Sequence, residues 1–384
     1  MKSSDTDILA EFDADWRQRF RGQLRRWYAR YGRELPWRNS RDPYRVWISE
    51  IMLQQTTVTA VVPFFKRFLA RFPDVSTLAA GEENDVLRMW EGLGYYSRAR
   101  NIHKAARIIV ADYGGEFPQD VAGLEALPGI GRYTAGAIVS FAYDRPAAIV
   151  EANTLRLYSR LLGYEQDPRS SSGQRLLWQF AESILPRKQP GTFNQALMDL
   201  GATVCTPVDP QCVACPVKSG CRAFQSGSQD RIPVPQKRPE LTDVTEAAVA
   251  IIHDEEYLLC RRPHGERWAG LWDFPRFATS EYSAPHNGRD LRKIRGELEG
   301  HLKTQLGLAA HVEDLLKQFR HSVTRYRIQL LCFTGRLANT TTQPNAEEYA
   351  WVCPSDFHEY PLSVTGRKFA DILVNKRSEL PFID

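Results

Sequence analysis

A short turn rich in proline and glycine lies between two helical patterns near the middle of the chain. Residues 127–131 read Leu-Pro-Gly-Ile-Gly, and apolar residues recur at helical spacing on both sides of them. Proline cannot continue a helix and glycine adopts backbone conformations that other residues avoid, so this composition favours a tight turn. The stretch 124–160 therefore predicts two helices joined by a hairpin. Taken alone, a turn of this kind also serves as a plain helix connector.

The hairpin has chemical as well as structural consequences. Gly129 and Gly131 lack side chains, so the backbone can approach a partner closely, and the first N–H groups of the helix that begins at Arg132 suit a phosphate. Further along, Glu151 ends the apolar run 147–150 and opens another helical pattern. The sequence thus places a candidate phosphate site near a carboxylate that emerges from apolar surroundings.

A second carboxylate lies in residues 46–57, a helical pattern that is apolar almost all round. Glu50 either faces solvent on the polar stripe of this helix or is desolvated, and desolvation raises the pKa of a carboxyl group toward neutrality. A carboxyl group with such a pKa is a general acid at physiological pH. Gln54, Gln55 and Thr56 follow it with three hydrogen-bonding side chains in adjacent positions.

A second glycine turn, residues 92–98, opens another helix. It contains Tyr95 and Tyr96, which either stack on a base or wedge into a duplex when exposed, or form a buried helix cap.

Composition and charge place the protein in a broad class. A chain of 384 residues predicts two or three domains, and 43% hydrophobic with 25% charged residues is typical of a soluble protein. It has no run of 18 apolar residues, and its polar start does not resemble a signal peptide, so we expect a cytoplasmic, nucleoid-associated protein.

The net charge is only +4, but residues 16–45 hold ten arginines against Glu34 and Asp42. This stretch is either a solvated helix face or a surface for a polyanion.

Four of the seven cysteines are clustered in the sequence. Four thiols this close together in a reducing compartment are typical of metal ligands rather than disulfides. Their spacing leaves a tetrahedral zinc ion and a four-iron cluster both open. Cys260, Cys332 and Cys353 are isolated among apolar neighbours and are interpreted as core residues. The clustered thiols are Cys205, Cys212, Cys215 and Cys221.

The period of the apolar pattern changes after residues 222–243, a proline-containing polar stretch that predicts a linker. Residues 247–252 and 257–260 flank Asp254-Glu255-Glu256 and are predicted to be the two strands of a hairpin. Further strands are expected at 326–333 and 349–352, with helices near 290–306 and 364–376. The predicted organisation is a mainly α N-terminal part at 1–221 and an α+β domain at 244–384.

Several motifs taken together resemble the helix-hairpin-helix DNA glycosylases, and among them the adenine DNA glycosylases. The resemblance covers nearly the whole chain. It implies a monofunctional base excision repair enzyme that hydrolyses the N-glycosidic bond of adenine mispaired with 8-oxoguanine or guanine. It also implies a monomer acting on double-stranded DNA, with a 4Fe-4S cluster on the four clustered cysteines. The motifs are Leu-Pro-Trp-Arg at 35–38, 49–56, 92–100, the hairpin at 127–135, 193–202 and the cysteine loop.

The resemblance assigns a role to each matching residue. Glu50 is similar to the acid that protonates adenine N7, Tyr133 and Asn153 to its helpers, and the hairpin residues Gly129, Gly131 and Arg132 to the DNA-backbone contacts. Tyr133 stands where lyase relatives of the endonuclease III type carry a lysine, which excludes a Schiff-base mechanism. The pocket wall is implied to be Trp37, Arg38 and Gln195, and the contacts to the opposite base Gln55, Thr56, Leu93, Tyr95 and Thr324.

The C-terminal region resembles a Nudix-like lesion-recognition domain. Residues 270–275, Gly-Leu-Trp-Asp-Phe-Pro, fit that pattern. The helix expected at 298–306 lacks the clustered glutamates of a pyrophosphatase, so we do not expect that activity.

Two departures from the family pattern bear on function. Glu151 stands where the family carries Asp, and Ala152 follows it in place of Gly. The lesion-reading loop, typically Phe-Ser-His, is Val-Thr-Arg at 323–325. The first departure leaves the rate and mechanism open, and the second leaves the preference for 8-oxoguanine open. The alternatives are therefore a glycosylase of shifted base specificity and a non-catalytic iron-sulfur DNA-binding protein.

Overall fold

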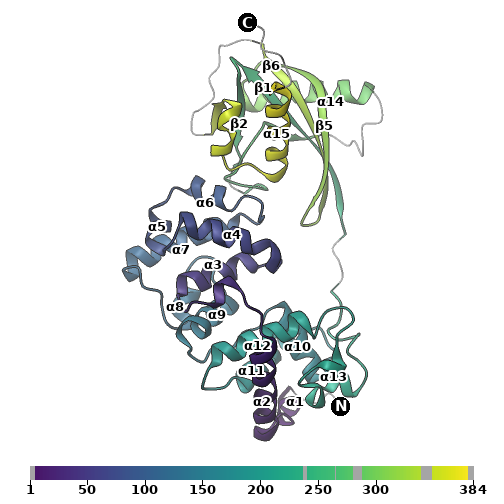
Figure 1. The fold of residues 1–384 in the computed structure, drawn as a ribbon. Coiled ribbons are helices and arrows are strands. Elements are labelled where there is room, and N and C mark those ends of the chain that lie inside the picture. The colour runs from purple at the N-terminus through teal and green to yellow at the C-terminus, as the bar shows by residue number, and fades with distance from the viewer. Residues whose placement is uncertain (1–4, 237–239, 264, 280–287, 339–347, 379–384) are drawn as a thin grey trace. The chain divides into compact units, whose positions relative to one another are not determined.

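The computed structural model describes residues 5–236, 240–263, 265–279, 288–338 and 348–378. The chain divides into two compact units, residues 1–80 with 101–237 and residues 81–100 with 238–384 (Figure 1). Part of the expected linker, residues 237–239, lies outside the described residues. Within the described ranges, no helix has both the length and the apolarity needed to cross a membrane.

The first unit is helical, which confirms the predicted mainly α part. Helix α7 (Ser97–Tyr113) begins among the residues assigned to the second unit and continues into the first. The other helices of the first unit are α1 (Asp5–Ala10), α2 (Ala14–Tyr31), α3 (Pro43–Leu53), α4 (Val58–Arg71), α5 (Val75–Ala80), α8 (Val121–Glu125), α9 (Arg132–Tyr143), α10 (Ala152–Leu162), α11 (Ser171–Ile184), α12 (Pro190–Thr203) and α13 (Arg222–Gln225).

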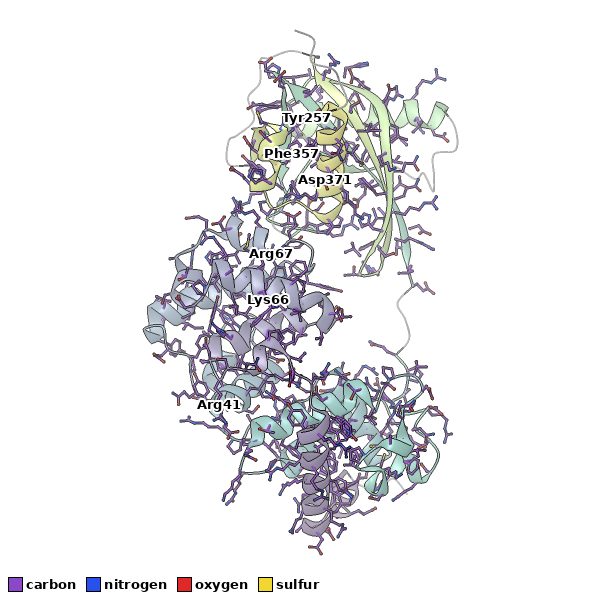
Figure 2. All side chains as sticks on the ribbon, viewed as in Figure 1. Arg41, Lys66, Arg67, Tyr257, Phe357 and Asp371 are labelled. Carbon is purple, nitrogen blue, oxygen red and sulfur yellow. The ribbon has the colours of Figure 1, made fainter. Side chains whose placement is uncertain are left out.

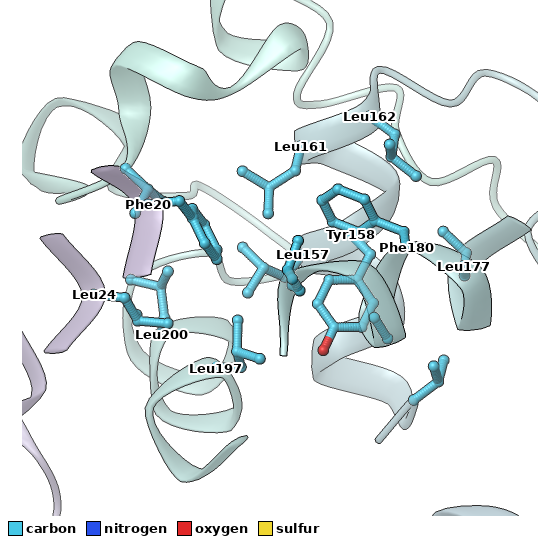
Figure 3. Packing of buried hydrophobic residues seen from close by; sticks show 14 of the residues in the cluster. Phe20, Leu24, Leu157, Tyr158, Leu161, Leu162, Leu177, Phe180, Leu197 and Leu200 are labelled. Carbon is cyan, nitrogen blue, oxygen red and sulfur yellow. The ribbon is translucent and has the colours of Figure 1, made fainter. Parts of the chain in front are cut away.

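An apolar core holds four of these helices together. Phe20 and Leu24 of α2, Leu157 of α10, Phe180 of α11 and Leu197 of α12 are all at most 2% exposed (Figure 3). Burial of large apolar side chains of this kind contributes about 1.5–3 kcal/mol each to the free energy of unfolding. This core fixes the start of α10 and the face of α12, from which candidate site residues project.

The predicted hairpin connects α8 to α9. Gly129 has φ +78°, and a Cβ there would lie 2.7 Å from the Cβ of Asn101, so this position requires glycine. Gly131 has φ −97° and serves as the N-cap of α9, and a Cβ there would meet no atom within 4 Å. Gly136, inside α9, lets that helix approach the main chain at Ala148, whose oxygen would lie 2.4 Å from an added Cβ.

The second unit contains one seven-stranded sheet, in which β1 pairs with β6 in parallel and the other pairs are antiparallel. The strand order is β3-β2-β1-β6-β5, with β4 on β1 and β7 on β2. The predicted hairpin of β1 and β2 is confirmed. The strands are β1 (Thr242–His253), β2 (Glu256–Arg261), β3 (Trp272–Asp273), β4 (Arg276–Ala278), β5 (Ala310–Val323), β6 (Tyr326–Leu337) and β7 (Tyr349–Val352).

Alternation along β1 separates two cores on opposite faces of the sheet. Val249 faces the core that includes α14 (Gly288–Leu306), whereas Ala248 faces the core that includes α15 (Val364–Ser378). On the α15 side the rings of Tyr257 and Phe357 lie 5.9 Å apart (Figure 2). This unit also includes helix α6 (Glu83–Met89) and the short 3-10 helix η4 (Pro354–Glu359). The predicted α+β character of this part is therefore confirmed.

Candidate active site

An open cleft of about 760 Å³ lies in the first unit, between α3, α9, α10 and α12. Nine of the residues that were assigned a role from the sequence line it, although they come from segments far apart in the chain. Most of the predicted pocket is therefore assembled in one place. These residues are Trp37, Arg38, Glu50, Gln55, Thr56, Tyr133, Glu151, Asn153 and Gln195.

Glu50 is the buried carboxyl group of the cleft. It projects from α3 and is 4% exposed, and the Tyr133 hydroxyl donates to its Oε2 at 2.5 Å. Burial raises the pKa of Glu50 to about 7, and the charge of Glu151 adds to this effect. The Tyr133 hydrogen bond and the Arg38 charge oppose it. Glu50 is thus in the desolvated state rather than on a solvent-facing stripe, and it can hold a proton near neutral pH.

Glu151 lines the same cleft but has a different environment, because it is the N-cap residue of α10. Its Oε1 accepts from the N–H of Thr154 at 2.9 Å and its Oε2 from the N–H of Asn153 at 2.8 Å. The Thr154 hydroxyl accepts in return from the N–H of Glu151 at 2.8 Å, which completes a capping box. Burial raises the pKa of Glu151, while the bonds from the helix N–H groups favour its ionised form. The residue therefore caps a helix and faces the cleft at the same time.

Asp199 of α12 supports the cleft wall through Arg38, and it was not predicted from the sequence. Its side chain is fully buried and bonds two guanidinium groups, with Arg38 donating at 2.8 and 2.9 Å and Arg33 Nε at 2.7 Å. Burial raises the pKa of Asp199, but the bonds and charges of Arg38 and Arg33 outweigh it, so the net pKa lies below its ordinary value. Asp199 lies four residues after Gln195, on the same face of α12, and this spacing was the available signal.

Arg156 is a second residue of the site that the sequence did not single out. It is 7% exposed and donates to the side chain of Asn153 at 2.9 Å. It also donates to the main-chain oxygens of Gly201 at 2.6 Å and Cys205 at 2.7 Å. These bonds hold Asn153 at the floor of the cleft.

The candidate DNA-backbone residues lie at the start of α9. Gly131 has no side chain to cap the first turn, so its geometry suits an anion. The Arg132 guanidinium lies 3.9 Å from the centre of the Trp178 ring and bonds Glu182 at 2.8 Å. Arg132 is thus held on the surface by neighbours of the same unit.

The arginine-rich helix α2 has a structural role that the charge count did not predict. Arg21 donates to the main-chain oxygens of Ile184 at 2.8 Å and Leu185 at 3.1 Å, and Arg25 donates to that of Lys188 at 2.6 Å. Cations at the C-terminus of a helix, here α11, interact favourably with its dipole. Part of the local positive charge therefore belongs to the fold.

Three of the five candidates for the opposite base lie on turns of the second unit, whereas Gln55 and Thr56 line the cleft of the first. Tyr95 has φ +48° and is 47% exposed, whereas Tyr96 is buried and its hydroxyl accepts from the N–H of Gly92 at 3.3 Å. The exposed Tyr95 therefore fits the alternative of stacking on a base or wedging into a duplex, and Tyr96 fits the alternative of a buried residue. Leu93 is buried. Thr324 is exposed with φ +52°, and its hydroxyl donates to the Val323 oxygen at 2.7 Å.

The four clustered cysteines are free thiols that line one small cavity. The Arg160 guanidinium donates to Cys205 Sγ at 3.3 Å, which is compatible with a thiolate ligand. Zinc would require four ligands about 2.0–2.3 Å from one centre. In the part of the chain that the structure describes, no three His, Cys, Asp or Glu side chains converge in this way. A four-iron cluster binds each thiolate to a different iron, and four thiols around one cavity are a ligand set of the kind that it needs.

The chain is similar to known DNA repair proteins. The HhH-GPD superfamily base excision DNA repair protein model matches residues 48–183, and the NUDIX domain model matches residues 247–371. The adenine DNA glycosylase of Rattus norvegicus is 34% identical, over 91% of this chain and 77% of that protein. The one of Buchnera aphidicola from Acyrthosiphon pisum is 39% identical, over 66% of this chain and 73% of that protein.

A solved structure supports the helical fold. The structure of a thermostable thymine-DNA glycosylase matches with a TM-score of 0.51 and 29% identity, covering 56% of this chain and 100% of that one.

The buried charge cluster yields a prediction about stability. We expect Asp199→Asn to lower the free energy of unfolding by about 3 kcal/mol, because it leaves two guanidinium groups without a compensating charge. The matched control is Glu182→Gln, which breaks the exposed pair with Arg132 and should cost no more than about 1 kcal/mol. Urea unfolding measures both, and equal small losses would contradict the prediction.

Proposed function

The chain belongs to the adenine DNA glycosylases of the HhH-GPD superfamily, and we propose that it removes adenine mispaired with 8-oxoguanine or guanine in double-stranded DNA. As a member it is an enzyme that hydrolyses the N-glycosidic bond of adenine. The observation that carries the proposal is the pair of carboxyl groups in one cleft, Glu50 with its pKa raised to about 7 and Glu151 bonded by helix N–H groups. Two carboxyl groups in different environments can act as acid and anion.

Glu50 supplies the proton for the leaving base. Its carboxyl proton passes to N7 of adenine, the C1′–N9 bond breaks with its electron pair on the base, and the sugar becomes an oxocarbenium-like cation. Tyr133, bonded to Oε2, fixes the carboxyl group in position. The base must leave the duplex stack to reach a group that is 4% exposed, so base flipping is required.

Glu151 acts on the sugar. Its carboxylate stabilises the cation or attacks the anomeric carbon, and water then adds at C1′ and releases a proton. Asn153 assists, because its side-chain nitrogen donates to Glu151 Oε2 at 3.3 Å. Tyr133 is not an amine, so it cannot form a Schiff base with the sugar.

The cysteine loop is proposed to hold a 4Fe-4S cluster on Cys205, Cys212, Cys215 and Cys221. Its support is the set of four free thiols around one cavity with Arg160 beside them. Burial raises the pKa of Cys215 to about 12 and that of Cys221 to about 11, and binding to a cationic cluster would deprotonate both thiols.

The dependence of adenine release on the opposite base is the first test of the function. We expect adenine to be released fastest opposite 8-oxoguanine, because Thr324 keeps an exposed hydroxyl on its turn. The margin over guanine should be smaller than in relatives with Phe-Ser-His, because Arg325 is a permanent cation. Single-turnover rates on the two duplexes measure the margin, and an adenine:thymine duplex is the control.

Restoring Phe-Ser-His at residues 323–325 should widen that margin. Equal rates opposite guanine and 8-oxoguanine would show that lesion reading has been lost. Release of a base other than adenine would favour the alternative of a shifted specificity.

The pKa of Glu50 predicts a pH dependence. A general acid works in its protonated form, so adenine release should be fastest below pH 7 and fall as the pH rises through about 7. The Tyr133 hydrogen bond lowers this pKa, so Tyr133→Phe should move the midpoint upward as well as slow the reaction. Single-turnover rates across this range test both statements, and a rate that increases with pH would exclude Glu50 as the acid.

Glu151 is expected to be a working catalytic carboxylate. Glu151→Gln keeps the size and an acceptor oxygen but removes the charge, and we expect adenine release to fall at least about 10²-fold. Asp144→Asn is the matched control, because Asp144 lies outside the cleft lining and Asn tolerates its φ of +51°. Duplex binding should survive in both variants. If Glu151→Gln released adenine at nearly the parent rate, Glu151 would not be a catalytic carboxylate.

The cluster proposal predicts metal content. Anaerobically purified protein should contain about four iron and four sulfide per chain. Cys215→Ser should lose iron, whereas Cys353→Ser, outside the loop, should keep it. About one zinc per chain without iron would contradict the proposal.

A further inference from the structure

A chain of polar side chains leads from the buried Asp199 to the wall of the cleft. Asp199 bonds Arg38, and Arg38 Nη1 donates to the Tyr28 hydroxyl at 3.4 Å. The Tyr28 hydroxyl in turn donates to Gln195 Oε1 at 2.9 Å, and Gln195 lines the cleft. Tyr28 lies on α2 and is not among the residues to which the sequence assigns a role.

The chemistry of these groups fixes the direction of every hydrogen bond in the chain. An ionised carboxylate only accepts and a guanidinium only donates. The Tyr28 oxygen therefore accepts from Arg38, and its single proton goes to Gln195. Burial raises the pKa of Tyr28, so the phenol keeps that proton.

The hydrogen bond from Tyr28 determines the orientation of the Gln195 side-chain amide. Its oxygen accepts from Tyr28 and keeps one further lone pair, whereas its nitrogen is a donor that has no partner among the described residues. A flipped amide would set its N–H against Tyr28 and leave the phenol proton without an acceptor. An unsatisfied buried donor costs about 1–3 kcal/mol.

We propose that Tyr28 is a positioning residue for base specificity, which orients the Gln195 amide so that a donor faces the Watson–Crick edge of the flipped base. This rests on the proposed function, because it takes the base in the cleft to be adenine. Adenine presents N1 as an acceptor on that edge, whereas guanine presents an N1–H donor. An N–H group on the pocket wall can bond N1 of adenine. It would face the N1–H group of guanine donor to donor, and these two unpaired donors disfavour guanine.

The experiment compares adenine with 1-deazaadenine, each placed opposite 8-oxoguanine. The parent protein should release 1-deazaadenine about tenfold more slowly beyond its intrinsic reactivity, the equivalent of about 1.4 kcal/mol. Tyr28→Phe should release adenine about tenfold more slowly and show less than about a twofold additional loss with 1-deazaadenine. The intrinsic reactivity of each base is the same with both proteins. Dividing the adenine to 1-deazaadenine rate ratio of the parent by that of Tyr28→Phe therefore isolates the contact to adenine N1 that depends on Tyr28.

Two further variants keep the test decisive. Tyr31→Phe changes an exposed tyrosine one turn away on the same helix and should leave both rates as in the parent. Gln195→Met retains Tyr28 and should also abolish the 1-deazaadenine effect, with no further loss in the Tyr28→Phe/Gln195→Met double variant. Additive losses in the double variant would overturn the inference.

The outcomes separate this inference from the proposed function. If the parent protein releases no adenine opposite 8-oxoguanine or guanine, the proposed function fails. If the parent is active but its release rate falls by the same factor as that of Tyr28→Phe when adenine is replaced by 1-deazaadenine, the role of Tyr28 is wrong and the proposed function stands.

Discussion

The removal of water from Glu50 is the constraint on which the chemistry of this protein depends. A carboxyl group holds its proton near neutral pH only where the charged form is poorly solvated. Helix α3 achieves this because it is buried along most of its length and packs against α9, which supplies Tyr133. The single hydrogen bond from Tyr133 orients the group without stabilising the anion as strongly as several donors would. The contrast with Glu151, bonded by two helix N–H groups, separates two residues of similar intrinsic acidity.

Arg38 makes this balance delicate, because a guanidinium beside a carboxyl group favours ionisation. Asp199 offsets that effect. Its buried carboxylate accepts from both terminal nitrogens of Arg38, at 2.8 and 2.9 Å, and so compensates part of the Arg38 charge. The α2–α10–α11–α12 core holds α12, and hence Asp199, in place. Packing outside the cleft thus holds the carboxylate that partly compensates Arg38, whose charge lowers the pKa of Glu50.

The sequence could predict local patterns and the residues that a motif carries, but not long-range pairing. Glu50, Tyr133 and Glu151 were all predictable, because each lies in a motif with its own pattern. Asp199 lies in the motif at 193–202 as well, but its bond to Arg38 was not predictable, because Arg38 lies 161 positions away and the spacing of Asp199 from Gln195 does not indicate a shared charge. Strand β5 was missed as well. Its burial alternates irregularly and its pairing with β6 shifts register between Val312 and Lys317, so no period of two is visible in the sequence.

The departure at Glu151 has a physical account in the capping box. A longer side chain gains one rotatable bond, and a misplacement of about 1 Å can cost on the order of 10²-fold in rate. Here both carboxylate oxygens are tied to N–H groups of α10, and the Thr154 hydroxyl fixes the main chain of Glu151 in return. The same turn is pressed against α12, because a Cβ on Gly201 would lie 2.8 Å from that of Asn153. The added methylene is therefore held at both ends, so the freedom that it introduces in an isolated side chain is lost in this fold.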